Sequence, residues 1–306
     1  MKISKSLASG FCRTLKAWKS ILIIWAGSLL TALLLAAPLR RFFKSGFGDS
    51  MITDRLQDGI DVEVFGDLGN ALGAMMSSFT AGIFVLMIIS LLLKVFLTGG
   101  IFDVIRRSSA RFSGRNFFKA CSANFWPFLV ITILVNTMLL LLFLVLFIVP
   151  VSLASQSASG SETLLFKTLI IAGVLYFLVS LVFVTAADYA RSWQAANEKP
   201  DCFGAIGFGF STSFRTFFSS YPVVLFIAII QFLLTWFSVS FIGKWTPDTG
   251  AAVFLLFIIS QILILTRISV KVIRYGSITF LKEVNEGKAK KVVNTTALTE
   301  NQNLQL

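Results

Sequence analysis

Three short motifs with charged ends recur along the chain, and they are the first places where its side chains could do chemistry. The motifs are Asp103-Val104-Ile105-Arg106, Asp188-Tyr189-Ala190-Arg191 and Lys271-Val272-Ile273-Arg274. Opposite charges three residues apart on a helix face each other, so the first two motifs predict local ion pairs worth about 0.2–0.5 kcal/mol each. Such pairs favour a role at a helix end near the membrane surface over catalysis. The candidate interfacial or docking residues are therefore Asp103, Arg106, Asp188, Arg191, Lys271 and Arg274.

Uncharged polar residues near the middle of long apolar segments form a second candidate set. The set consists of Asn136, Thr137, Tyr176, Gln231 and Gln261. An amide or hydroxyl in hydrocarbon needs a hydrogen-bond partner, and cross-helix bonds of this kind are worth about 0.6 kcal/mol each. Two interpretations follow. The residues either tie helices together, or they form a polar seam that lines a substrate path.

No combination of residues predicts an enzyme. Histidine is absent, which removes the commonest general base and the commonest zinc ligand. Three cysteines, Cys12, Cys121 and Cys202, are spaced unlike any metal site. The sequence also lacks a P-loop, a nucleophile elbow and a zinc-protease motif. We therefore expect no catalytic, cofactor-binding or metal-binding residues.

The composition indicates that lipid is the solvent for most of the chain. Of its 306 residues, 56% are hydrophobic and only 14% are charged, and the mean hydropathy is +0.83. Water-soluble domains have about 45–50% apolar residues and about 25% charged ones. The net charge of +12 comes from basic residues that flank apolar segments, so we do not expect a nucleic-acid partner.

Six apolar stretches are long enough to cross a bilayer, which takes about 20 residues. They lie near 20–38, 79–98, 125–151, 164–187, 221–243 and 250–272. Twenty Lys and Arg residues lie before the first, after the second, after the fourth and around the end of the sixth stretch, against six on the opposite side. Because basic residues are retained in the cytoplasm, this asymmetry predicts a multi-pass protein of a bacterial cytoplasmic (inner) membrane with both termini inside.

The two ends and the longest external segment allow further predictions. Residues 1–37 also resemble a signal peptide, and its cleavage would leave five spans; an apolar stretch longer than the usual 7–15 residues favours retention. A short amphipathic helix is predicted around 51–58. Residues 284–306 are polar and lack aromatic side chains, which predicts a disordered cytoplasmic tail after a membrane domain that spans 1–283.

The charged motifs also mark a threefold internal repeat. They are separated by 85 and 83 residues, and each ends a pair of apolar stretches. The repeats cover about 1–106, 107–191 and 192–274, which predicts an all-α membrane protein with six transmembrane helices in three repeated units. Each unit is an interfacial amphipathic helix followed by a transmembrane hairpin.

The segment that opens each unit is rich in aromatic and basic residues. In the first, Ile3, Leu7, Phe11, Leu15 and Trp18 recur every three or four residues and form one helical stripe. Such a helix lies among lipid headgroups, with its basic side chains near anionic lipid. These opening segments either anchor the spans or form a collar that contacts anionic lipids or a protein partner of unknown identity.

Two blocks that contain the motifs support a resemblance. The Asp188–Arg191 exit with its Phe-rich continuation, and the similar block from Asp103 to Trp126, resemble a diffuse group of uncharacterised bacterial six-helix membrane proteins. That group includes the membrane domain attached to some glycerophosphoryl diester phosphodiesterases. The catalytic domain has no counterpart in these residues, so the resemblance implies only an inner-membrane setting and a link to lipid or envelope physiology.

The function expected from these features is non-enzymatic. It is the organisation or regulation of a lipid- or envelope-related process. The alternative is the transmembrane permease component of a transporter that works with a separate ATPase.

Overall fold

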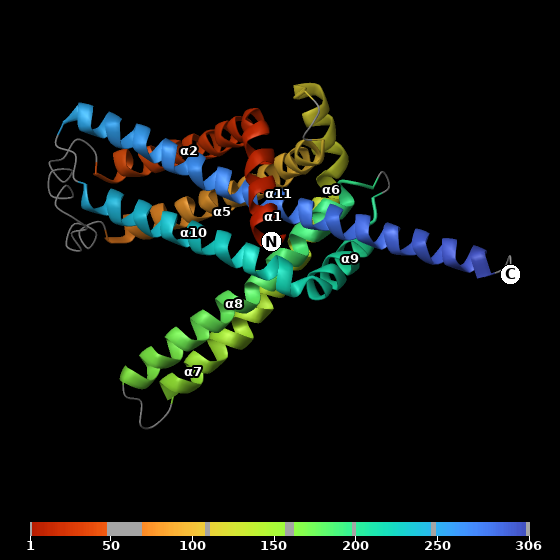
Figure 1. The fold of residues 1–306 in the computed structure, drawn as a ribbon. Coiled ribbons are helices and arrows are strands. Elements are labelled where there is room, and N and C mark those ends of the chain that lie inside the picture. Colours follow the sequence, from red (N-terminus) through yellow and green to blue (C-terminus); the bar gives the residue numbers. More distant parts are fainter. Residues whose placement is uncertain are drawn as a thin grey trace. The chain divides into compact units, whose positions relative to one another are not determined.

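The computed structural model describes residues 2–47, 69–107, 111–156, 162–197, 200–245 and 249–303. Every regular element in these ranges is a helix (Figure 1). The elements are α1 (Lys2–Lys16), α2 (Trp18–Phe47), α5 (Gly69–Arg106), α6 (Gly114–Phe143), the π-helical turn η1 (Leu144–Ile148), α7 (Val149–Gln156), α8 (Glu162–Gln194), α9 (Cys202–Arg215), α10 (Phe217–Lys244) and α11 (Gly250–Asn303).

Within these residues, five helical segments are long and apolar enough to cross a membrane. They are 82–106, 114–155, 163–194, 217–244 and 250–287. A sixth is present if α1 and α2, which meet at a bend of 72°, count as one broken span. In the last segment, none of the most apolar 18-residue window is buried inside the protein. Since such apolar surface is unstable in water, the expectation of an all-α, multi-pass membrane protein is confirmed at this level.

The chain divides into two compact units. The larger comprises Met1–Leu22 and Val95–Leu306, and the smaller comprises Ile23–Lys94. The smaller unit contains most of α2 and the first part of α5. All the contacts described below lie within the larger unit.

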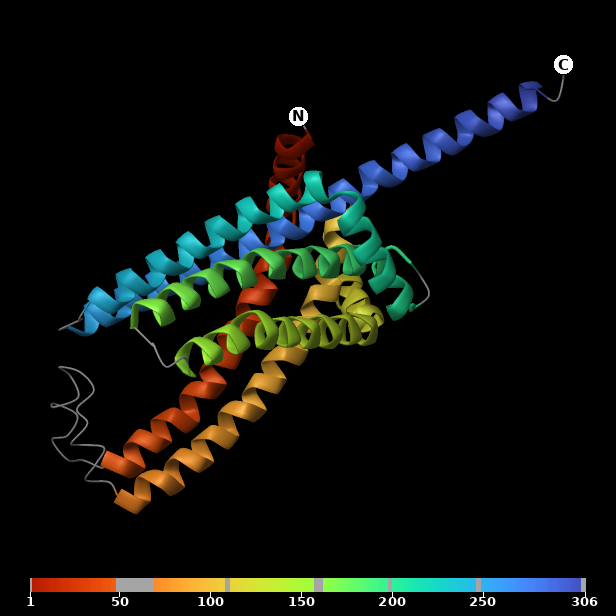
Figure 2. The same cartoon turned by 90° about the horizontal axis from the view of Figure 1, so that it is seen from below.

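Helix α8 is the centre of the larger unit, because it packs against α6, α9, α10 and α11. Its last turns contribute the fully buried Tyr189, whose ring packs with Leu181, Val224 and Ile278. The Tyr189 hydroxyl lies 3.1 Å from the hydroxyl of Thr216, at the junction of α9 and α10. Figures 1 and 2 both show α10 running beside the first part of α11.

Helix α1 crosses α11 at very close range. The Cα atom of Gly10 lies 3.0 Å from the position of a Cβ atom built on Gly276, so only glycine fits there. On one side of this crossing, the Ser6 hydroxyl donates to the carbonyl of Ser277 at 3.1 Å. On the other side, Arg13 donates to both carboxylate oxygens of Glu283 at 3.0 and 2.6 Å. Glycine and polar contacts thus fix α1 to α11.

The three expected repeat units differ from one another in the structure. The first unit opens with a separate helix, α1, and the third with α9, which α10 follows after a break at Thr216. In the second unit the opening segment is the first part of α6 itself, since the helix continues through Pro127. The threefold repeat therefore stays a prediction.

The sequence also predicts a disordered tail at 284–306 and a short helix around 51–58. Helix α11 continues to Asn303, so the structure has a helix through most of the segment 284–306, for which the composition predicts disorder. Extending an existing helix avoids the cost of nucleation, and this segment contains no proline. The helix predicted around 51–58 lies outside the described residues.

Candidate functional site

The carboxylate of Asp188 lies at the centre of a buried ionic cluster. Its side chain has no exposed surface, and it contacts two arginines from different parts of the chain. Arg191, one turn later on α8, approaches Oδ1 at 3.2 Å. Arg274 on α11 brings its Nε to 2.7 Å from Oδ2, an ion pair whose N–H direction falls outside hydrogen-bond geometry. The cluster therefore joins α8 to α11.

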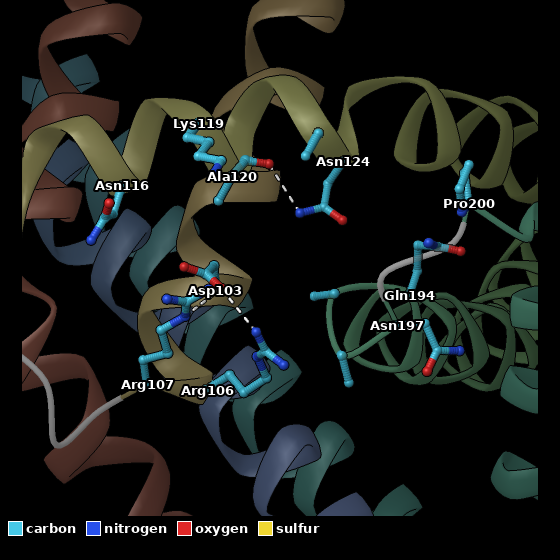
Figure 3. A pocket seen from close by; sticks show the side chains of 13 residues that line it. Asp103, Arg106, Arg107, Asn116, Lys119, Ala120, Asn124, Gln194, Asn197 and Pro200 are labelled. Atoms are coloured by element: carbon cyan, nitrogen blue, oxygen red, sulfur yellow. Dashed lines mark hydrogen bonds and ion pairs between the residues drawn. The ribbon is translucent and has the colours of Figure 1, made fainter.

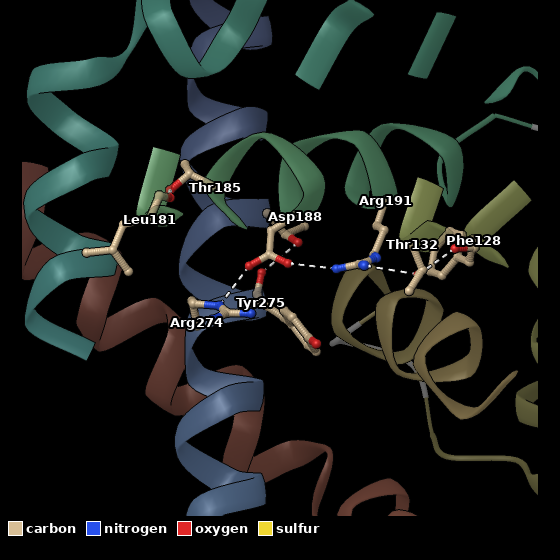
Figure 4. A network of polar contacts seen from close by, with 9 residues as sticks. Phe128, Thr132, Leu181, Thr185, Asp188, Arg191, Arg274 and Tyr275 are labelled. Atoms are coloured by element: carbon tan, nitrogen blue, oxygen red, sulfur yellow. Dashed lines mark hydrogen bonds and ion pairs between the residues drawn. The ribbon is translucent and has the colours of Figure 1, made fainter. Parts of the chain in front are cut away.

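Arg191 also connects the cluster to a third helix (Figure 4). Its Nη2 donates to the hydroxyl of Thr132 on α6 at 3.2 Å, and this hydroxyl donates in turn to the carbonyl of Phe128 at 2.6 Å. Both oxygens of Asp188 are thus occupied by guanidinium groups. This arrangement is suited to holding three helices together.

A second polar layer joins α8 and α11 one to two turns further along. The hydroxyl of Ser192 lies 3.3 Å from that of Thr279. The ammonium group of Lys282 donates to the carbonyl of Ser192 at 3.1 Å and lies 3.6 Å from a carboxylate oxygen of Glu286. Lys282 is only 4% exposed. Buried lysines are rare unless paired, so these contacts explain its place.

Asp103, near the end of α5, forms a separate ionic group. Its Oδ1 accepts from Arg106 Nη2 at 3.2 Å and from Arg107 Nε at 3.0 Å. The Asp103 carboxylate is largely buried, whereas the arginine side chains are 36% and 56% exposed. A single acceptor atom thus orients two guanidinium groups at the surface.

A cavity of about 390 Å³ opens beside Asp103 (Figure 3). It is bounded by the end of α5, the first turns of α6 and the segment that joins α8 to α9. Most of its polar side chains are cations and amides: Arg106, Arg107, Lys119, Asn116, Asn124, Gln194 and Asn197. Figure 3 shows the two arginines and Gln194 on different walls of this cavity. Specific ligand sites typically have volumes of about 300–1,000 Å³.

The structure brings some of the residues predicted from the charged motifs together. The predicted local pairs, Asp103 with Arg106 and Asp188 with Arg191, both form. Arg274, from the third motif, joins Asp188 in the same cluster. Lys271 instead places its ammonium group 5.9 Å from the ring centre of Tyr275.

The mid-depth polar residues have different environments. Asn136 and Thr137 are exposed on α6. Tyr176 is half-buried, with its ring edge-on to Phe143 at a centroid distance of 5.4 Å. Gln231 and Gln261 are also half-buried. Their function as helix ties or as a polar seam stays a prediction.

Sequence reasoning missed several residues of these sites. Arg107, Thr132 and Lys282 lie in or near the charged motifs or spans, but nothing in their spacing indicates which side chain each would contact.

No protein-family model, curated protein or solved structure matches this chain.

Proposed function

We propose that this chain is a non-enzymatic, six-span protein of a bacterial cytoplasmic membrane. It organises or regulates a lipid- or envelope-related process by contacting anionic lipids at the cytoplasmic face, where both termini lie. The observation that carries this proposal is the two-sided character of α1, which is fixed to α11 on one side and exposes apolar and basic residues on the other.

The exposed side of α1 has the composition of a lipid-contacting surface. On α1, Ile3, Phe11 and Leu15 are 39%, 51% and 58% exposed, and Trp18, the first residue of α2, is 55% exposed. Exposed lysines are interspersed with them on α1 at Lys5 and Lys16, and Lys19 follows at the start of α2. Apolar side chains of this kind insert among acyl chains, while basic residues are attracted to anionic headgroups.

The contacts of α1 connect this surface to α11. Gly10 leaves no space between α1 and α11, and the Arg13–Glu283 pair connects their next turns. A lipid that displaced α1 would therefore also act on α11, whose residues Arg274 and Lys282 contact α8. This coupling supports a regulatory role over simple anchoring.

Purification in mild detergent, followed by native mass spectrometry, tests the proposed function. We expect anionic phospholipid to remain bound and no ATPase subunit to be present. A stoichiometric ATPase subunit would instead support the permease alternative. Protein that carries no anionic lipid at all would overturn the proposal.

Reporter fusions test the proposed orientation. We expect a fusion at Gly250 to report an external location and a fusion at Lys290 to report a cytoplasmic one, because twenty flanking basic residues against six favour this orientation. Paired alkaline phosphatase and green fluorescent protein fusions measure the two locations. An external Lys290 contradicts the orientation.

A further inference from the structure

We propose that the cavity beside Asp103 binds a phosphate monoester. The phosphate is carried either by a lipid headgroup or by a soluble molecule. The inference goes beyond the lipid contact proposed for α1, because it assigns a second site, lined by α5, α6 and the segment between α8 and α9, and a ligand class for it. It rests on the charge, the donor geometry and the depth of the cavity.

The charge of the cavity matches that of a phosphate monoester. Three cations, Arg106, Arg107 and Lys119, and one carboxylate, Asp103, line it, for a net charge of +2. A phosphate monoester carries a charge of about −1.5 to −2 at pH 7. A phosphodiester carries a single negative charge and would leave part of this positive charge uncompensated.

The cavity also presents oriented hydrogen-bond donors. Each guanidinium has five N–H groups, and Asp103 accepts one from Arg106 and one from Arg107. The remaining donors include pairs suited to the bidentate contacts that arginine makes with phosphate. Asp103 thus fixes both side chains and offsets one of their charges, without occupying all of their donors.

Residues close to the cavity place it at the depth of lipid headgroups. Trp126, which follows the cavity residue Asn124 by two positions on α6, is 70% exposed, and Phe118, next to Lys119, is 49% exposed. Tryptophan is enriched where headgroups meet acyl chains. The long apolar run of α6 begins at once after Trp126. A phosphate on a lipid headgroup therefore lies at the height of Lys119 when the chain is in a bilayer.

The experiment uses the full chain in detergent and compares two double variants of equal charge. Arg107→Gln with Lys119→Gln removes two cations from the cavity. Arg111→Gln with Arg115→Gln removes two exposed cations that do not line it. Native mass spectrometry measures the binding of phosphatidate and phosphatidylglycerol, and isothermal titration calorimetry measures the binding of glycerol 3-phosphate.

We expect one phosphatidate to bind per chain, more tightly than phosphatidylglycerol. The cavity variant should weaken this binding by about tenfold or more. The loss of one hydrogen bond to a charged group already costs more free energy than a tenfold change in affinity represents. The control variant should change it less than about twofold, because Arg111 and Arg115 are exposed to solvent, which screens their charges, and do not line the cavity. The single reversal Lys119→Glu should weaken it too. Melting temperatures establish that all variants are folded.

The two ligand sources give different results. Binding of phosphatidate alone identifies the lipid as the source, and comparable binding of glycerol 3-phosphate shows that the phosphate group suffices. Equal weakening by both double variants, equal affinity for phosphatidylglycerol, or no binding of either monoester would overturn the inference. Such a failure leaves the proposed function standing if anionic lipid still co-purifies with the unmodified chain.

Discussion

Replacement of Asp188 by alanine is expected to lower the free energy of unfolding by about 3–5 kcal/mol, the usual cost of breaking a buried ion pair from one side. The change leaves Arg274 and Arg191 facing each other without the carboxylate between them. Their like charges then repel in a region from which water is largely excluded. The melting temperature in detergent, measured by size-exclusion chromatography of heated samples, should fall sharply.

Two further variants test whether unpaired buried arginines cause the loss of stability expected for Asp188→Ala. Asp103→Ala removes the same group from a site whose arginines are 36% and 56% exposed. Solvent screens these charges, so the expected loss is only about 0–1 kcal/mol. Adding Arg274→Met to Asp188→Ala should recover part of the lost stability, because the buried charge is then absent. Equal melting temperatures for Asp188→Ala and Asp103→Ala would contradict this explanation.

Replacement of Gly209 by leucine is expected to separate α9 from α8. A Cβ atom built on Gly209 would lie 3.0 Å from the Cβ atom of Ala190 and 3.1 Å from its amide nitrogen, and it would overlap the carbonyl oxygen of Ala186. Two of these three atoms belong to the backbone, which cannot move as a side chain can. Overpacking at such contacts costs about 1–3 kcal/mol, and more where backbone must shift.

Gly207 provides a matched control two residues away on the same helix. A Cβ atom at Gly207 meets nothing within 4 Å. Leucine there should raise the stability by about 0.5–1 kcal/mol, because glycine is a poor helix former. The two variants should therefore shift the melting temperature in opposite directions. Shifts of the same sign and size would show that α9 does not pack on α8 as described.

The proposed phosphate site assigns a function to one of three regularly spaced basic residues around the start of α6. Their spacing alone does not indicate which of them would contact a ligand. Arg111, Arg115 and Lys119 are spaced four residues apart, yet only Lys119 lines the cavity. Its partners, Arg106 and Arg107, come from the end of a different helix. A lipid phosphate bound there would bridge α5 and α6, and so connect the headgroup layer to the ends of two candidate spans.

Much of the fold could be predicted from the sequence because membrane insertion depends on local composition. Runs of about 20 apolar residues specify helices in lipid. A helix is the structure in which one segment satisfies its own backbone hydrogen bonds without water or a neighbouring strand. The i, i+3 ion pairs at Asp103 and Asp188 were equally predictable, because helix geometry alone places those side chains together.

Only the tertiary structure decided which helices meet at these charges. The sequence determined where apolar helices occur, and that their charged ends gather basic residues. It did not determine that Arg274 would reach Asp188 across 86 positions, or that Arg106 and Lys119 would share a cavity. Contacts between helices depend on packing at close range, as at Gly10 and Gly209, and residues that pack together need no regular spacing in the sequence.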